Sequence, residues 1–235
     1  ITARLEHPSI VPLYDAGVTD AGQPFYVMRK VSGRPLERMI AETPSLDERL
    51  MLLPNVLTVA QAVAHAHRRG ILHRDIKPSN ILVGDLGETV LIDWGLAKVV
   101  GESSDDPQPR APTDPVDPDL APSAAVETMH GSIFGTPGFM APEQARGESL
   151  DPRTDVYALG STLYHLISGR PPLHGGSASE EIDRAKSEQP EDLDIAALPV
   201  QPELIAILKK ARAFAPRDRY PDAAALADDL NRFLA

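Results

Sequence analysis

Four residues with acidic, basic and amide side chains lie close together in the sequence, in a pattern that could perform phosphoryl transfer. Asp75 and Lys77 are separated by one residue, Asn80 follows soon after, and Asp93 comes after two short apolar runs. Phosphoryl transfer needs metal-held phosphates, positive charge near the moving group and a carboxylate that orients the incoming hydroxyl. Asn80 and Asp93 offer oxygen ligands that suit Mg²⁺, and Lys77 offers a mobile positive charge. The pattern therefore indicates a candidate site for this chemistry.

Three motifs containing these residues follow one another along the chain. They are HRDIKPSN at residues 73–80, DWG at 93–95 and GTPGFMAPE at 135–143. The ordered set resembles the signatures of the eukaryotic-like protein kinases, namely the H-R-D-x-K-P-x-N catalytic loop, the D-F-G metal loop and the A-P-E motif. The resemblance covers essentially the whole chain outside residues 101–127. It implies a protein-kinase-like fold of the α+β class, with a mainly helical large lobe.

The resemblance implies a role for each matched residue. Asp75 would accept the proton of the substrate hydroxyl, Lys77 would steady the γ-phosphate of ATP, and Asn80 and Asp93 would hold Mg²⁺. Thr136 would lie near Asp75. The lysine two residues after the catalytic aspartate, and Thr136 ahead of the A-P-E motif, are typical of the serine/threonine class. The resemblance thus implies transfer of phosphate from ATP to protein Ser and Thr hydroxyls.

Other positions would bind the adenine ring of ATP. Met28 would be the gatekeeper, backbone groups of Arg29 and Val31 would bond the adenine, and Leu82 would form the floor beneath it. The resemblance also divides the chain into residues 1–31, a remnant of the small lobe that ends at the hinge, and residues 32–235, the large lobe.

Four residues would support the site. The resemblance implies that His73 packs beside the catalytic loop and that Asp155 braces this loop from a helix. It also implies that Glu143 and Arg219 form a buried ion pair in the large lobe. Breaking a pair of that kind costs about 3–5 kcal/mol, because the remaining charge stays buried.

Arg74, directly before the catalytic aspartate, is typical of kinases that are switched by phosphorylation of the activation segment. A phosphate adds about −1.5 to −2 charge that an arginine can bind. Thr128 and Ser132 are the candidate phosphorylation sites, and a kinase–kinase dimer is the expected means of activation. Residues 101–127 contain six prolines and seven acids but one base, Arg110. This composition predicts disorder, and we hypothesise that the segment tunes access to the substrate groove.

The spacing of apolar and turn residues predicts the elements that position these groups. Two hairpins are expected, and Ser45 and Glu48 read as a capping box that opens a helix. Pro54 predicts a kink or a late start in that helix, and Gly70 its end. The expected strands are 10–14, 25–31, 81–83 and 90–92, and the other expected helices are 155–168, 203–213 and 223–234.

The sequence departs from the kinase pattern in three respects. Trp94 replaces the usual Phe of D-F-G and is expected to fill the same apolar pocket. Arg29 and Lys30 occupy hinge positions that are often acidic or aromatic. The chain opens without Met, and it contains no G-x-G-x-x-G loop, no V-A-I-K-like lysine and no helix-C glutamate. We expect the chain to be a piece truncated from an intact kinase, with weak nucleotide affinity and little activity of its own.

Composition limits the partners. The formal net charge of -11 argues against nucleic acid, and the absence of cysteine excludes disulfides and Cys-based zinc sites. No apolar run approaches the roughly 20 residues needed to cross a bilayer, so no membrane contact is expected within the chain. ATP and protein substrates are the expected partners, in the cytoplasm, although segments outside this chain could provide a membrane anchor. The alanine-rich helices and the turn residues are typical of the bacterial branch.

Two other functions compete with the kinase interpretation. A pseudokinase that acts as a binding scaffold would lack the small-lobe lysine in the complete protein. A small-molecule phosphotransferase of similar fold would share the Asp-to-Asn spacing but not the lysine and proline at 77–78 or the A-P-E segment. His65 and His67 could suggest a metal site, but their spacing places them on different helix faces and no third ligand converges.

Overall fold

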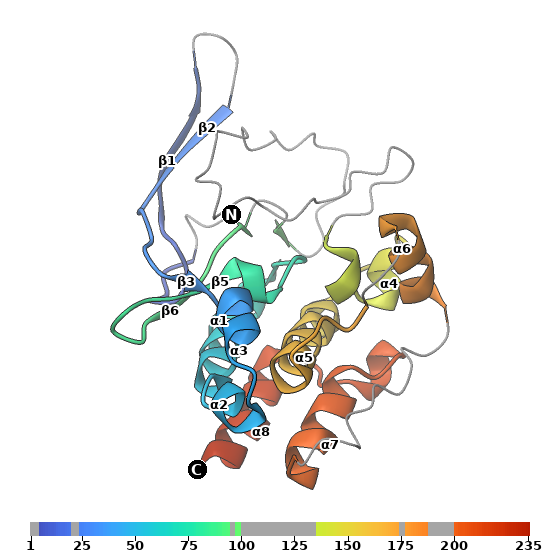
Figure 1. Cartoon of the computed structure of the whole chain (residues 1–235). Coiled ribbons are helices and arrows are strands. Elements are labelled where there is room, and N and C mark those ends of the chain that lie inside the picture. Colours follow the sequence, from blue (N-terminus) through green and yellow to red (C-terminus); the bar gives the residue numbers. More distant parts are fainter. Residues whose placement is uncertain (1–4, 20–23, 95–96, 100–134, 174–176, 188–199) are drawn as a thin grey trace.

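The computed structural model describes residues 5–19, 24–94, 97–99, 135–173, 177–187 and 200–235. Figure 1 shows a narrow β hairpin extending from a larger body that is mainly helical. The hairpin consists of β1 (Leu13–Val18) and β2 (Pro24–Met28), which pair antiparallel with a register irregularity between Leu13 and Asp15. The predicted hairpin is therefore present, although its first strand begins and ends later than expected. Tyr14, Val18, Val27 and Met28 expose large apolar side chains on it.

Short strands bracket the two loops that contain the candidate catalytic and metal-binding residues. β5 (Ile81–Val83) lies between β3 (Arg34–Pro35) and β6 (Thr89–Leu91) in a three-stranded antiparallel sheet. β4 (Ile71–Leu72) pairs separately with β7 (Lys98–Val99). The loop at 73–80 thus runs from β4 to β5, and the loop after Leu91 runs from β6 to β7. β4 is paired with β7, and β5 is paired with β6. The two loops therefore begin and end on neighbouring strands, which places them side by side.

The helical body is built around α5 (Pro152–Ser168), which is buried over most of its length. α3 (Leu53–His67), α7 (Pro202–Ala211) and α8 (Ala223–Leu234) pack against it, and α3 and α8 also pack on each other. These helices share one apolar core with the sheet residues Ile81 and Leu91. The remaining helices are α1 (Leu36–Glu42), α2 (Leu46–Leu50), α4 (Pro142–Ala145) and α6 (Ala178–Lys186), and the 3₁₀ turns are η2 (Pro78–Asn80), η5 (Pro137–Phe139) and η7 (Pro216–Asp218).

Helix ends show where local sequence signals decided the structure. The Asp151 side chain caps α5 by accepting a hydrogen bond from the Arg153 backbone N–H, and Gly169, at φ 75°, ends the helix. α3 begins at Leu53 with Pro54 in its first turn, which is the predicted late start. The predicted capping box at Ser45 does not form, because the Ser45 side chain makes no cap hydrogen bond and α2 ends after five residues. The single long helix expected there is therefore two helices.

The other helix predictions were correct to within two or three residues at each end. α7 corresponds to the predicted 203–213 helix, and α8 has the predicted bounds. α1, α4 and α6 were not predicted. The segment 101–127, predicted to be disordered, lies outside the described residues. None of the helices that the structure describes is both long enough and apolar enough to cross a membrane.

Candidate active site

The Asp75 carboxylate is the point at which the predicted catalytic residues meet. Its Oδ1 atom accepts hydrogen bonds from the Thr136 backbone N–H and hydroxyl, both at 2.9 Å. Its Oδ2 atom lies 3.2 Å from the Lys77 ammonium and accepts a bond from the Asn80 amide at 3.2 Å. Asp75 is nonetheless buried, with 5% of its surface exposed. Bonds from four donors therefore hold this buried carboxylate in one orientation.

Lys77 and Asn80 are each fixed by a second contact. The Lys77 ammonium donates to the Thr136 hydroxyl at 2.6 Å, so Thr136 bridges the lysine and the aspartate. The Asn80 amide N–H₂ also donates to the Asp75 backbone carbonyl at 2.9 Å. With the amide nitrogen used in this way, the Asn80 Oδ1 atom faces no hydrogen-bond donor among the described residues. That oxygen is thus available to a cation.

The catalytic loop is braced by Asp155 from α5. This fully buried carboxylate accepts hydrogen bonds from the backbone N–H groups of His73 and Arg74, both at 2.9 Å. Burial by itself raises the pKa of the Asp155 carboxyl, but the hydrogen bond from His67, with the nearby His73 and the Arg74 backbone N–H, outweighs it and holds the pKa below its usual value. A charged Asp155 is the form that best accepts two N–H donors.

His67 supplies the third contact to Asp155, and sequence reasoning did not find it. The His67 Nε2 atom lies 3.0 Å from Asp155 Oδ2, while its Nδ1 atom accepts a hydrogen bond from the Ala223 backbone N–H at 3.3 Å. Because Nδ1 accepts, a neutral His67 ring must carry its proton on Nε2 and donate it to Asp155. A polar path therefore runs from the start of α8 through His67 and Asp155 to the catalytic loop. No spacing in the sequence signals it.

Arg74 adopts a left-handed backbone conformation, with φ 71°. Its carbonyl accepts a hydrogen bond from the Gln144 side chain at 2.7 Å, another contact that sequence reasoning missed. Partial burial lowers the pKa of the Arg74 guanidinium, and the charge of Asp155 works in the opposite direction. The expected phosphorylation sites, Thr128 and Ser132, lie outside the described residues.

The metal-loop residue Asp93 is connected to the catalytic loop through its neighbour Ile92. The Ile92 N–H donates to the Asn80 carbonyl at 2.9 Å, and the His73 ring lies 3.1 Å from the Ile92 carbonyl. Asp93 itself is exposed, and its carboxylate makes no hydrogen bond with the described residues. His73 thus supports both loops, in addition to packing.

Asn80 and Asp93 fit a magnesium ion of the kind that binds together with a nucleotide. Mg²⁺ prefers oxygen ligands and usually takes only one or two from the protein, the rest coming from phosphate and water. The two residues offer an amide oxygen and a carboxylate that make no hydrogen bond with any residue the structure describes. Over the described ranges, no group of three or more His, Cys, Asp or Glu residues is arranged to hold a metal without such a partner.

The residues expected to contact adenine lie at the base of the hairpin and on the central sheet. Met28, at the end of β2, is 56% exposed, Arg29 is exposed and Val31 is half-buried. Leu82 is buried on β5, where its backbone pairs with Pro35 of β3. The segment 29–33 between β2 and β3 therefore connects the hairpin to the sheet that carries Leu82.

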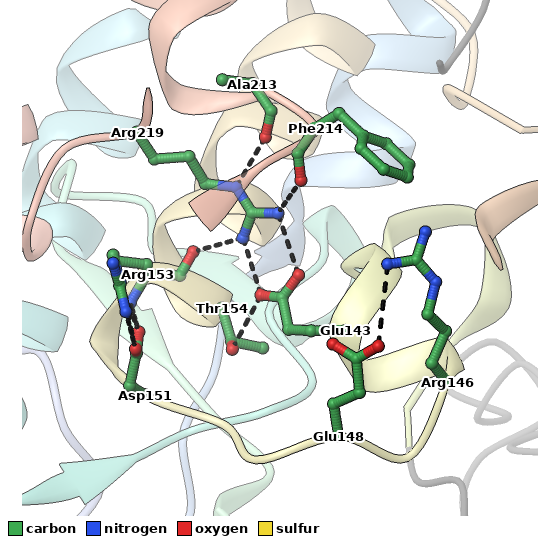
Figure 2. A network of polar contacts seen from close by, with 9 residues as sticks. All are labelled: Glu143, Arg146, Glu148, Asp151, Arg153, Thr154, Ala213, Phe214 and Arg219. Atoms are coloured by element: carbon green, nitrogen blue, oxygen red, sulfur yellow. Dashed lines mark hydrogen bonds and ion pairs between the residues drawn. The ribbon is translucent and has the colours of Figure 1, made fainter. Parts of the chain in front are cut away.

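Glu143 and Arg219 form a bidentate ion pair, shown in Figure 2. The two guanidinium nitrogens lie 2.7 and 2.9 Å from the two Glu143 oxygens, and both side chains are buried. The remaining polar atoms are also used, because Thr154 donates to Glu143 and Arg219 donates to the carbonyls of Arg153, Ala213 and Phe214. The pair thereby joins α4, the start of α5 and the segment between α7 and α8.

Comparison with known proteins identifies similar chains. A family model described as "Protein kinase domain" matches residues 1–229. The serine/threonine-protein kinase PknD of Protochlamydia amoebophila is 32% identical over all of this chain and 24% of its own length. The serine/threonine-protein kinase PknB of Mycobacterium leprae is 34% identical over 98% of this chain and 34% of its own length. The chain thus spans about a quarter to a third of the length of these relatives.

A solved structure agrees with these matches. The Mycobacterium tuberculosis PknI kinase domain superposes with a TM-score of 0.67 at 26% identity, over 98% of this chain and 74% of that chain. This likeness confirms the predicted α+β fold of the kinase type. The names of the relatives support the serine/threonine class and the bacterial branch, and none of the names given above describes a pseudokinase.

Proposed function

The chain belongs to the protein kinase domain family, and we propose that it is the catalytic domain of a serine/threonine protein kinase. It would transfer the γ-phosphate of ATP to Ser and Thr hydroxyls of protein substrates. The observation that carries this proposal is the convergence of Thr136, Lys77 and Asn80 on the Asp75 carboxylate. A pseudokinase scaffold would have no chemical need for this arrangement together with an Asp93 carboxylate that is unbonded among the described residues.

Each residue has a defined part in the proposed reaction. Asp75 orients the substrate hydroxyl and accepts its proton, and its bonds to Thr136 and Asn80 keep it pointed in one direction. Lys77, whose ammonium lies 3.2 Å from Asp75 Oδ2, places positive charge beside the phosphoryl group. Asn80 and Asp93 would hold Mg²⁺, which neutralises the negative charge of the ATP phosphates when bound.

ATP would bind where the hairpin meets the central sheet. Leu82 supports the adenine ring from β5, Met28 borders the pocket, and backbone groups of Arg29 and Val31 bond the ring edge. This assignment divides the chain into a small-lobe part at residues 1–31 and a large lobe at 32–235. It places the nucleotide between the two parts, with its phosphates directed toward Asn80 and Asp93.

Regulation by phosphorylation is part of the proposal. Arg74 lies directly beside Asp75, and its backbone is held by both Asp155 and Gln144. A phosphate on Thr128 or Ser132, added by a second copy of the kinase in the cytoplasm, would bring negative charge to this arginine. Such a bond would connect the phosphorylated residue to the catalytic loop.

The test is transfer of radiolabelled phosphate from ATP and Mg²⁺ to a generic basic protein. It uses the full-length protein that carries this chain, its Asp75→Asn variant and, as a matched control, Asp47→Asn, which changes an exposed acid on α2. We expect the Asp75→Asn variant to lose roughly 10²–10⁴-fold in rate, the usual contribution of a general base, and the control to keep full activity. Equal labelling by the wild type and Asp75→Asn would rule the proposal out.

A further inference from the structure

The metal loop contains a hydrogen bond that the usual phenylalanine could not make. The Trp94 indole N–H donates to the Leu91 carbonyl at 3.1 Å. Leu91 is the last residue of β6 and is fully buried, while Trp94 is 8% exposed. Since donor and acceptor stand three residues apart, the bond closes a ring around Ile92 and Asp93. A side chain thereby ties the end of a buried strand to the residue just after the metal-binding carboxylate.

Asp93 has no hydrogen-bond partner for its side chain over the ranges that the structure describes. Its backbone lies in the left-handed region at φ 62°, a conformation that costs a non-glycine residue about 1–2 kcal/mol. Its carboxylate is exposed and makes no hydrogen bond within the described part of the chain. The orientation of this carboxylate therefore depends on how firmly the residues on either side are held.

Ile92, the residue before Asp93, has a partner for both its backbone N–H and its backbone carbonyl. The Ile92 N–H is bonded to the Asn80 carbonyl, and the Ile92 carbonyl faces the His73 ring. His73 also contacts the Trp94 ring, with centroids 4.6 Å apart and the planes at 63°. A phenyl ring could make a similar edge contact with His73. It has no N–H, so it would leave the Leu91 carbonyl without this donor.

We propose that Trp94 is a positioning residue for Asp93, acting through its indole hydrogen bond to Leu91. The bond restrains the backbone on the far side of Asp93, as the Ile92 bonds restrain the near side. The carboxylate is then presented in a single orientation before the metal and nucleotide arrive, so less ordering is needed on binding. The inference rests on the proposed function, in which Asp93 holds Mg²⁺.

The test separates the hydrogen bond from the shape of the ring. Trp94 is replaced in the full-length protein by benzothienylalanine, which keeps the two fused rings but has sulfur in place of the N–H. Trp94→Phe is the second variant. The dissociation constant of Mn²⁺·ADP is measured by electron paramagnetic resonance, and KM for Mg²⁺·ATP and kcat are measured by phosphate transfer. Hydrogen exchange of the amides of residues 92–94 is followed without nucleotide.

We expect the benzothienylalanine variant to bind Mn²⁺·ADP roughly two- to tenfold more weakly, the range set by one neutral hydrogen bond. KM for Mg²⁺·ATP should rise by the same factor with kcat little changed, and exchange of these amides should accelerate. The Trp94→Phe variant should show the same changes. The melting temperature of the benzothienylalanine variant should stay close to that of the wild type, which excludes general unfolding as the cause.

Each remaining outcome decides the matter. An unchanged dissociation constant and unchanged exchange in the benzothienylalanine variant would overturn the inference, as would a fall in kcat alone. If the wild type binds Mn²⁺·ADP but transfers no phosphate, the proposed function fails, while the binding comparison still supports or refutes the role of Trp94. If the wild type does not bind Mn²⁺·ADP, Asp93 is not a metal ligand and the inference is refuted as well.

Discussion

The two carboxylate oxygens of Asp75 have different hydrogen-bond partners. Oδ1 receives both donors of Thr136, whereas Oδ2 faces Lys77 and Asn80. The Thr136 hydroxyl is a shared atom, because it donates to Asp75 and accepts from Lys77. A single hydroxyl therefore contacts both the proposed base and the proposed positive charge, which also contact each other directly.

Replacing this hydroxyl tests its part in the reaction. Thr136→Val keeps the backbone N–H bond to Asp75 but removes two contacts with charged groups. Hydrogen bonds of that type contribute about 1.5–3 kcal/mol, so we expect kcat/KM to fall roughly 10- to 100-fold. Thr136→Ser retains the hydroxyl and is the matched control, with activity close to the wild type. Steady-state phosphate transfer measures both, and a fully active Thr136→Val variant would contradict the expectation.

Spacing alone predicted contacts only between residues that are close in the chain; contacts between distant residues were implied by the resemblance to kinases or were missed. The bond between Asn80 and Asp75 joins residues of one short loop, so the spacing alone suggests it. Thr136 lies 61 residues beyond Asp75, and only the resemblance to kinases placed the two near each other. The contact between His67 and Asp155 spans 88 residues, and it arises from the packing of α3 on α5. Nothing in the local sequence specifies how two helices pack, so this contact was missed.

At the scale of elements, identical local signals had different outcomes. Ser45 and Glu48 carry the capping-box pattern but do not form it, whereas Ser177 and Glu180 form the complete box at the start of α6. The pattern at 177–180 could have predicted α6. α8 was predicted well because it buries one apolar face, and α5 because nearly all of its residues are buried; burial rather than capping supplies most of the stability of a helix.

His165 shows how burial on α5 creates a dependence on pH. It is 5% exposed, its Nδ1 atom has no hydrogen-bond partner among the described residues, and Arg49 donates to the carbonyls at the end of the same helix. Burial, and then the charge of Arg49, lower the pKa of His165 from 6.5 to about 4. Between these values the unfolded chain binds a proton that the folded chain does not bind, so stability falls as the pH drops through this range.

We therefore expect His165→Leu to remove much of this acid sensitivity. Between pH 7 and pH 4.5 the wild type should lose roughly 2–3 kcal/mol of unfolding free energy through His165, in addition to losses that both proteins share. Urea unfolding at the two pH values measures the difference, with the pH 7 values as the internal reference for any change in packing. If both proteins lost the same free energy over this range, His165 would not be the titrating group.

At the scale of the whole molecule, the candidate active site is held in place by strand pairing and by buried polar contacts. Strand pairing places the catalytic and metal loops beside each other, through β5 with β6 and β4 with β7. Buried polar contacts then fasten the loops to the helical body, through Asp155 on α5 and through His67 to the start of α8. The overall fold followed from the motifs and from apolar periodicity. The resemblance to kinases also implied the bracing by Asp155, but the contacts of His67 were missed, because they depend on the final packing of helices that are distant in sequence.

The ion pair of Glu143 and Arg219 joins two residues 76 positions apart, and the cost of removing it depends on whether one charge or both are removed. Both side chains are buried, so Glu143→Leu strands the guanidinium and Arg219→Met strands the carboxylate. Each single variant should lose about 3–5 kcal/mol of unfolding free energy. The double variant removes both charges, although it leaves the Thr154 hydroxyl and three backbone carbonyls without their partners.

The double variant should therefore lose less than the sum of the two single losses. The difference, obtained from urea unfolding of all four proteins, is the coupling energy of the pair, and we expect about 1–3 kcal/mol. Losses that simply add would mean that each side chain acts through its other partners. In that case the contacts of Arg219 with the carbonyls of residues 153, 213 and 214 would be what joins α5 to the segment before α8, and Glu143 would serve only to neutralise the guanidinium.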